Sequence, residues 1–127
     1  MKIAEFLETN IFVKTDFSSP ANLRRLNFTG VYALADPTGE IVYIGKAYST
    51  THTIKDRLNQ YRQNTNTGNR GLHDVIAKDK GLVTQAEILD YIRTLTIYAF
   101  HHTDTEQAFI CSASPKYNKE YKGGQNA

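Results

Sequence analysis

Two tyrosines, one arginine and one glutamate are the residues whose types and spacing could carry chemistry. Tyr32 and Tyr43 lie in two apolar runs joined by a turn, and the hairpin that this pattern predicts places them opposite each other on one face of a sheet. Arg57 lies at the margin of an apolar helix stripe, where an arginine usually reaches a specific partner. Glu106 shares a helix face with apolar residues at i+3, i+4 and i+7, and a buried carboxylate is costly unless it is paired or binds a cation.

Each of these residues also has a purely structural interpretation. Two phenols side by side on a hairpin are a common form of cross-strand packing. The stem of Arg57 could pack on the helix stripe while its charged head stays in water. Thr103 and Glu106 have the spacing of a capping box for the same helix, and Asp104 with Gln107 offers a second one. Taken one at a time, these residues leave both interpretations open.

The elements that must position these residues follow from hydrophobic periodicity. Residues 30–35 and 40–45 predict two strands joined by an Asp-Pro-Thr-Gly turn at 36–39, with Ala35 facing Glu40. Ile54, Leu58 and Tyr61 form the apolar stripe of a helix over residues 54–63. Further helices are expected at residues 72–79, 85–93 and 104–113, and a third strand at residues 94–100.

Composition and charge narrow the class of protein. A chain of 127 residues fits one domain. Fifteen Lys and Arg against thirteen Asp and Glu leave a net charge of only +2, so any nucleic-acid contact would need a local basic face. The single cysteine, Cys111, excludes an intramolecular disulfide and a thiolate zinc site built within one chain. No stretch reads as a signal peptide or a membrane span, so we expect a soluble, cytoplasmic protein.

Five short motifs follow one another along the chain. Gly-Val-Tyr at residues 30–32 is followed, after ten residues, by Tyr-Ile-Gly at 43–45 and then Lys-Ala. The helix with Arg57, the helix that begins near Glu106 and a Pro-x-x-Asn element ending at Asn118 come next. Together these motifs resemble the GIY-YIG nuclease family, with Val31 in place of the usual isoleucine. The resemblance is nearest to the incision domain of bacterial nucleotide-excision repair and to small phage or restriction nucleases.

The resemblance implies both a fold and an activity. The expected fold is α+β, a small three-stranded antiparallel sheet flanked by helices. Residues 30–118 would be the nuclease core, residues 1–29 an N-terminal arm and residues 119–127 a basic, flexible tail. The expected activity is metal-dependent hydrolysis of DNA phosphodiester bonds, by a nick or a double-strand cut. A catalytically inert DNA-binding module and a structural domain are the alternatives, and competent residues at all five motifs favour the enzyme.

Roles for the individual residues are also implied by the resemblance. Tyr32 would be the general base or would orient the attacking water, with Tyr43 beside it. Arg57 would contact the scissile phosphate and stabilise the charge that develops there. Lys46 would help lower the pKa of a phenol or contact phosphate. Glu106 would hold one divalent metal ion, Mg or Mn, together with water molecules.

The remaining expectations concern support, DNA contact and assembly. Asn118 would be a structural residue that supports the site, and His52, in a polar loop over residues 48–53, is a further candidate whose alternative is a solvated histidine. The partner would be double-stranded DNA. A homo-oligomer could form through the apolar run at residues 11–13, unless that run packs on its own sheet. The residues expected to form a basic DNA-binding face are Lys55, Arg62, Arg70, Lys78 and Lys80.

Overall fold

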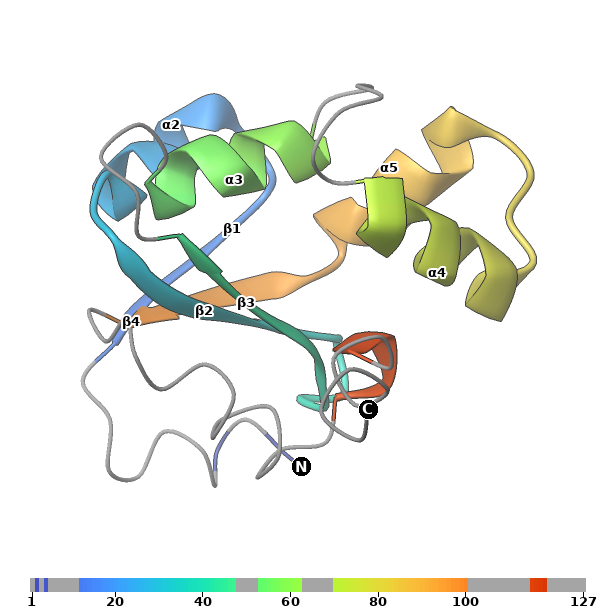
Figure 1. The fold of residues 1–127 in the computed structure, drawn as a ribbon, viewed down its shortest axis with the longest axis horizontal. Coiled ribbons are helices and arrows are strands. Elements are labelled where there is room, and N and C mark those ends of the chain that lie inside the picture. The colour runs from blue at the N-terminus through green and yellow to red at the C-terminus, as the bar shows by residue number, and fades with distance from the viewer. Residues whose placement is uncertain are drawn as a thin grey trace, which may run out of the picture.

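An antiparallel sheet forms the centre of the molecule in the computed structural model, which describes residues 2, 4, 12–47, 53–62, 70–100 and 115–118. Within these residues the sheet has four strands in the order β1-β4-β2-β3 (Figure 1). The strands are β1 (Val13–Asp16), β2 (Gly30–Ala35), β3 (Ile41–Ala47) and β4 (Thr96–Phe100). The expected α+β class is therefore confirmed, and the expected strand count of three was wrong.

The additional strand, β1, comes from the segment that we expected to lie outside the core. It pairs antiparallel with β4, and Val13 faces Ala99 and packs against the core. The ring of Phe12 lies 5.7 Å from the ring of Tyr98 and 6.4 Å from that of Phe100. Phe12 and Val13 therefore lie on their own sheet, although Phe12 is also exposed; Ile11 lies outside the described residues, and an oligomer interface here stays a prediction. A strand of only four residues, with Ser18-Ser19-Pro20 beginning two residues after its end, is too short to predict from an alternating sequence pattern.

The β2–β3 turn is one residue shorter than expected. The backbone N–H of Asp36 donates to the carbonyl of Glu40 at 2.9 Å, so only three residues lie between the paired positions. Gly39 takes the positive φ of 87° that such a turn needs. One carboxylate oxygen of Asp36 also accepts hydrogen bonds from the backbone N–H groups of Thr38 and Glu40. Asp36 therefore fixes the turn through both its backbone and its side chain.

A bulge shifts the β2–β3 pairing by one more residue. Leu34 pairs with Tyr43, but the next residue of β2, Ala35, pairs with Ile41. Val42 is therefore left as an extra, unpaired residue on β3. Tyr32 consequently pairs with Gly45, and the expected pairing of Tyr32 with Tyr43 was wrong. Both tyrosines still point to one face of the sheet, because Tyr43 and Gly45 are two residues apart on β3.

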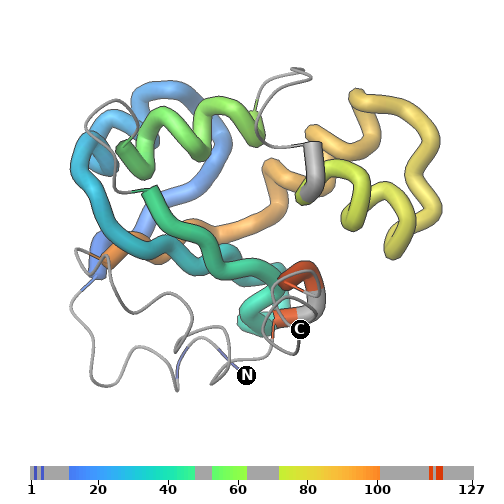
Figure 2. Tube along the Cα trace, in the orientation of Figure 1, coloured from blue at the N-terminus to red at the C-terminus, as the bar shows by residue number. Residues whose placement is uncertain are grey.

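The helices gather on the face of the sheet to which Tyr32 points. They are α2 (Pro20–Leu23), α3 (Ile54–Arg62), α4 (Arg70–Lys80) and α5 (Gln85–Arg93), with 3₁₀ turns η1 (Arg24–Leu26) and η2 (Lys116–Asn118). The helices expected at residues 54–63, 72–79 and 85–93 are thus confirmed. Helix α3 lies over the sheet, while α4 and α5 form a pair to one side of it (Figures 1 and 2).

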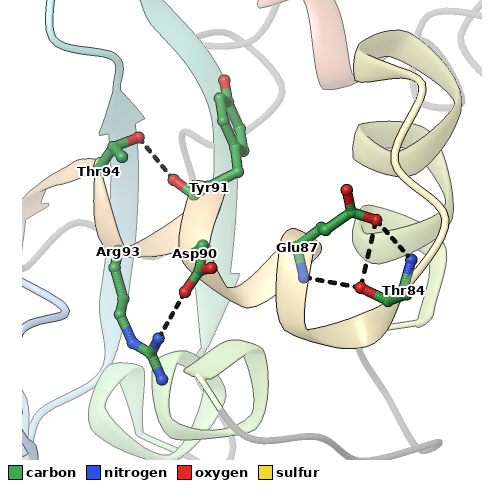
Figure 3. Close-up of polar contacts among 6 residues, drawn as sticks. All are labelled: Thr84, Glu87, Asp90, Tyr91, Arg93 and Thr94. Carbon is green, nitrogen blue, oxygen red and sulfur yellow. Dashed lines mark hydrogen bonds and ion pairs between the residues drawn. The ribbon is translucent and has the colours of Figure 1, made fainter.

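Capping interactions fix where α5 begins and ends. The hydroxyl of Thr84 accepts from the backbone N–H of Glu87, whose carboxylate accepts from the N–H of Thr84 in return (Figure 3). At the other end the hydroxyl of Thr94 donates to the carbonyl of Tyr91, and β4 begins two residues later. Helix α5 therefore leads directly into the strand that lies beside β2.

Every residue of β2 is buried, because both faces of the sheet are covered. On the helix side, Tyr32 and Leu34 pack in the same cluster as Ile54, Leu58 and Tyr61 of α3. A second cluster on the opposite face contains Val31, Ala33, Ile44, Tyr98 and Phe100. Strand β2 is therefore an inner strand, buried along its whole length, on which Tyr32 is carried. No helix in the described part of the chain is long and apolar enough to cross a membrane.

Candidate functional site

Three tyrosines from three different elements meet between α3 and the sheet. The ring of Tyr32 on β2 lies 6.4 Å from that of Tyr43 on β3 and 6.2 Å from that of Tyr61 on α3. The rings of Tyr43 and Tyr61 are also 6.2 Å apart and nearly perpendicular, a favourable edge-to-face arrangement. The hydroxyl oxygens of Tyr32 and Tyr61 lie 2.6 Å apart, in a hydrogen bond to which either can donate. We call Tyr32, Tyr43, Tyr61 and the neighbouring Arg57 the tyrosine–arginine cluster.

Gly45 gives the Tyr32 ring the space that it occupies. The ring lies directly across the backbone of its pairing partner, so a Cβ atom on Gly45 would lie 2.5 Å from Cζ and 2.9 Å from Cε2 of Tyr32. Carbon atoms in contact are normally about 3.5–4.0 Å apart. A residue with any side chain at position 45 would therefore displace the Tyr32 phenol, which explains the glycine within β3.

Burial keeps the phenol of Tyr32 protonated. Loss of water raises its pKa well above the ordinary value, and the neighbouring phenols of Tyr61 and Tyr43 raise it further. The charge of Arg57 acts in the opposite direction but does not reverse the shift. Tyr32 is fully buried, whereas Tyr43 is only partly buried. Of these two phenols, Tyr43 is thus the one that solvent or a substrate can reach.

Arg57 is the cation of the cluster. Burial acts to lower the pKa of its guanidinium, but the phenols around it, Tyr61 first and then Tyr32 and Tyr43, raise that pKa above the ordinary value. Its Nε is buried and has no hydrogen-bond acceptor among the residues that the structure describes. A buried N–H without an acceptor is costly, and an anionic oxygen placed beside it would remove that cost.

The start of α3 determines where Arg57 lies. The hydroxyl of Thr53 caps the N–H of Asp56, and the Asp56 carboxylate accepts from the backbone N–H of Thr53 in return. The N–H of Ile54 donates to the carbonyl of Phe28, just before β2. This bond joins the first turn of α3 to the strand that holds Tyr32. Arg57 and Tyr61 lie one turn apart on the same helix and therefore face the same side.

Asn118 supports β3 at Ile44, the middle residue of the Tyr-Ile-Gly motif. Its Oδ1 accepts from the backbone N–H of Ile44 and its Nδ2 donates to the Ile44 carbonyl, both at 2.7 Å. The side chain is buried, and its amide makes the two hydrogen bonds to the backbone of Ile44 that a residue of a neighbouring strand would make. The adjacent Tyr117 donates from its hydroxyl to the carboxylate of Asp79 on α4, so η2 links β3 to the α4–α5 pair. This geometry suits the structural role expected for Asn118.

Lys46 does not lie beside the phenols. It pairs with Val31, and because side chains alternate along a strand it points to the face opposite Tyr43 and Gly45. The charge that acts on the Tyr32 phenol is that of Arg57. A contact between Lys46 and phosphate therefore stays a prediction, and the effect on a phenol that we expected from Lys46 comes from Arg57.

Several residues named in the sequence analysis lie outside the part of the chain that the structure describes. Two are expected site residues, Glu106 with its whole helix and the candidate His52; the others are Cys111 and the tail at residues 119–127. Among the described residues no group of three or more His, Cys, Asp or Glu side chains could hold a metal ion. A single carboxylate with water ligands would not form such a group, so the metal site proposed at Glu106 stays a prediction.

The expected DNA-binding residues fall on two separate helices. Lys55 and Arg62 of α3 are seven residues apart and therefore share a face of that helix. Lys78 and Lys80 are exposed near the end of α4, where Lys80 lies 5.3 Å from the centre of the Tyr91 ring. The side chain of Arg70 is outside the described part. The two pairs of basic residues are thus carried by different elements of the fold.

Tyr61 is the residue of the cluster that sequence analysis missed. The sequence analysis assigned it to the apolar stripe of α3, and its side chain is indeed buried, with a relative exposure of 1%. The available signal was its spacing, four residues after Arg57, on a helix stripe that faces two other phenols. A tyrosine on such a stripe cannot be distinguished from core packing until the partner of its hydroxyl is known.

Comparison with known proteins adds independent information. A family model described as a UvrC-like GIY-YIG domain matches residues 28–119. The UvrABC system protein C of Treponema denticola is 34% identical over 97 residues, which cover 76% of this chain. The same match covers 13% of that relative, so this chain corresponds to a small part of its length. The matched residues include all of β2, β3 and α3, which carry the tyrosine–arginine cluster.

Proposed function

This chain belongs to the family of UvrC-like GIY-YIG domains, and from that premise we propose that it is a metal-dependent DNA endonuclease. The reaction would be hydrolysis of a phosphodiester bond, giving a nick or a double-strand cut. The observation that carries the proposal is the buried Nε of Arg57, which has no acceptor in the described structure and is surrounded by three phenols. A phosphate oxygen is an acceptor of the charge and geometry that this group binds best.

Tyr43 is the phenol that we propose as the general base. An unperturbed phenol has a pKa near 10, so it needs a neighbouring cation to act as a base near neutral pH. Arg57 supplies that cation. A water oxygen would attack phosphorus while Tyr43 takes the proton, and the bond from phosphorus to the leaving oxygen would break. We expected Tyr32 in this role, but its complete burial and raised pKa favour Tyr43.

Tyr32 and Tyr61 would then position the reacting groups. Their hydroxyl–hydroxyl bond of 2.6 Å fixes α3 against β2, and both rings contact Tyr43. Arg57 would bind the scissile phosphate and stabilise the charge that builds on it in the transition state. Because the cluster is assembled from buried elements of the fold, its side chains are held close together before substrate binds, and only a local movement that opens the Nε of Arg57 would be needed.

Glu106 is the proposed ligand of one Mg or Mn ion. Its single carboxylate is of the oxygen type that these hard cations bind, with water completing the coordination shell. When bound, such a cation neutralises phosphate charge and stabilises the leaving oxygen. Lys46, Lys55 and Arg62 would contribute further phosphate contacts, and the duplex would be held through its backbone.

Two other functions for the same fold make different predictions. A DNA-binding module without activity would bind duplex DNA and leave it intact. A structural domain would use the tyrosine–arginine cluster only as a buried polar network and would neither bind nor cut DNA.

Incubation of the protein with supercoiled plasmid, with Mg or Mn and with or without chelator, separates these functions. We expect nicked or linear plasmid with metal, none with chelator, and recovery when metal is added back. A parallel gel-shift assay in chelator measures DNA binding without cleavage. Binding without cleavage under every metal condition would favour the inert module, and absence of both would favour the structural domain.

A further inference from the structure

His73 on α4 is a buried titratable residue that the proposed mechanism does not use. Its relative exposure is 2%, and it lies between the buried apolar residues Leu72 and Ile76 on the same helix. Burying an imidazole among apolar groups is unfavourable unless its ring N–H is hydrogen-bonded. An apolar residue would suit a position that served packing alone.

The imidazole of His73 contacts the backbone of the cluster. Its Nε2 lies 3.0 Å from the carbonyl oxygen of Tyr61 on α3. Because a carbonyl only accepts, Nε2 must carry the proton and donate it. Tyr61 is the penultimate residue of α3, in the last turn, where helix carbonyls lack a donor from their own helix. His73 therefore fixes the end of α3 at the residue that holds Tyr32.

Tyr61 is the residue through which the other members of the cluster are joined. Its hydroxyl lies 2.6 Å from that of Tyr32, and its ring meets the ring of Tyr43 nearly at right angles. It is also the strongest of the phenols acting on the charge of Arg57. A shift of the Tyr61 backbone would change all three contacts together.

We propose that His73 is a positioning residue for the cleavage reaction, acting through the carbonyl of Tyr61. By holding the last turn of α3, it sets the placement of the Tyr61 phenol against Tyr32, Tyr43 and Arg57. The proposal rests on the proposed function for its effect on cleavage. Its effect on the placement of Tyr61 can be measured without any activity.

Two amide substitutions test the proposal with matched polarity. In His73→Gln the side-chain amide nitrogen reaches about as far as Nε2, so the hydrogen bond to Tyr61 can be kept. In His73→Asn the amide is one methylene shorter and cannot reach the carbonyl. Ile76→Val, on the same helix and equally buried, is the control for a general loosening of α4.

Two readouts are compared for the three variants. One is the NMR resonance of the buried Tyr32–Tyr61 hydroxyl proton, and the other is the single-turnover rate of plasmid nicking with metal. We expect His73→Asn to shift or broaden the hydroxyl resonance and to slow nicking at least about tenfold, as a small misplacement of reacting groups does. His73→Gln and Ile76→Val should keep both the resonance and the rate.

The outcomes separate the two proposals. If the wild-type protein does not nick DNA but His73→Asn alone alters the hydroxyl resonance, the proposed function fails and the positioning by His73 stands. If His73→Asn keeps the wild-type resonance and rate, the inference is overturned. It is also overturned if Ile76→Val slows nicking as much as His73→Asn, because the effect would then be general to α4.

Discussion

Replacing Gly45 by alanine should damage the protein at a defined place, the ring of Tyr32. The added Cβ would lie 2.5 Å from Cζ of that ring, so the ring must move by about 1 Å to reach ordinary contact distance. The ring has little freedom to move, because Tyr32 is fully buried on a central strand and its hydroxyl is held by Tyr61. The substitution should therefore break the Tyr32–Tyr61 hydrogen bond.

The size of the effect follows from two contributions to the free energy of unfolding. Forcing an extra carbon into a packed core costs about 1–3 kcal/mol. Loss of one buried hydrogen bond costs about 1 kcal/mol. Gly45→Ala should thus lower the free energy of unfolding by about 2–4 kcal/mol, measured by urea denaturation followed by far-UV circular dichroism. The Gly45→Ala protein that remains folded should also nick plasmid more slowly than the wild type.

Gly81→Ala is the matched control. Gly81 has a positive φ of 66° and no atom within 4 Å of the position of its added Cβ. The cost of this substitution, about 1–2 kcal/mol, comes from backbone strain alone. It should lower stability without changing nicking, because it lies on the turn after α4 and away from the tyrosine–arginine cluster.

A double substitution tests the cause of the Gly45 effect. Tyr32→Leu removes the distal ring atoms with which the new Cβ collides, so Gly45→Ala should cost much less in that background. The coupling between the two positions should be about 1–3 kcal/mol. If the two changes are additive, or if Gly45→Ala alone leaves stability unchanged, the close approach of Gly45 and Tyr32 is refuted.

Three further substitutions follow from the same geometry. Tyr61→Phe removes the hydroxyl bound to Tyr32 and should destabilise the fold by about 1 kcal/mol, with a larger loss in nicking rate than in DNA affinity. Asn118→Ala removes both hydrogen bonds to the backbone of Ile44 and should lower the free energy of unfolding by about 2–3 kcal/mol in urea. Lys55→Ala should weaken DNA binding for all sequences and reduce the slope of log affinity against log salt by about one.

Each of these has a control and an outcome that contradicts it. Tyr91→Phe removes a phenol outside the cluster and should leave nicking unchanged; equal loss in both tyrosine variants would deny Tyr61 a role. Asn118→Asp keeps the acceptor for Ile44 and should be less harmful than Asn118→Ala. Lys14→Ala, on β1, should leave the salt slope as in the wild type, and an unchanged slope in Lys55→Ala would remove α3 from the DNA interface.

The sequence predicts the hairpin well and its register poorly, for a physical reason. Two apolar runs around Pro and Gly define β2, β3 and the turn between them. The register depends on the bond between Asp36 and Glu40 and on the bulge at Val42, and neither has a sequence pattern of its own. The two single-residue shifts add up to two residues. The Tyr32 side chain therefore stays on the expected face of the sheet, but its pairing partner is Gly45 and not Tyr43.

The candidate site divides in the same way. The motifs directed attention to Tyr32, Tyr43 and Arg57, and the structure brings these three together. They did not reveal that Tyr61 completes the cluster or that His73 holds Tyr61. On a helix stripe a polar group that is satisfied by a distant partner looks like any other core residue. Such partners become visible only when the tertiary contacts are known.

The most direct test of the central claim is the single-turnover rate of plasmid nicking by Arg57 variants, measured with saturating protein and Mg or Mn. Arg57→Lys keeps the positive charge and loses the planar guanidinium, and Arg57→Met keeps the apolar stem and loses the charge. If the tyrosine–arginine cluster hydrolyses DNA, Arg57→Met should slow nicking by about 10²–10³, with Arg57→Lys between it and the wild type. Nicking at the wild-type rate by folded Arg57→Met would contradict the account.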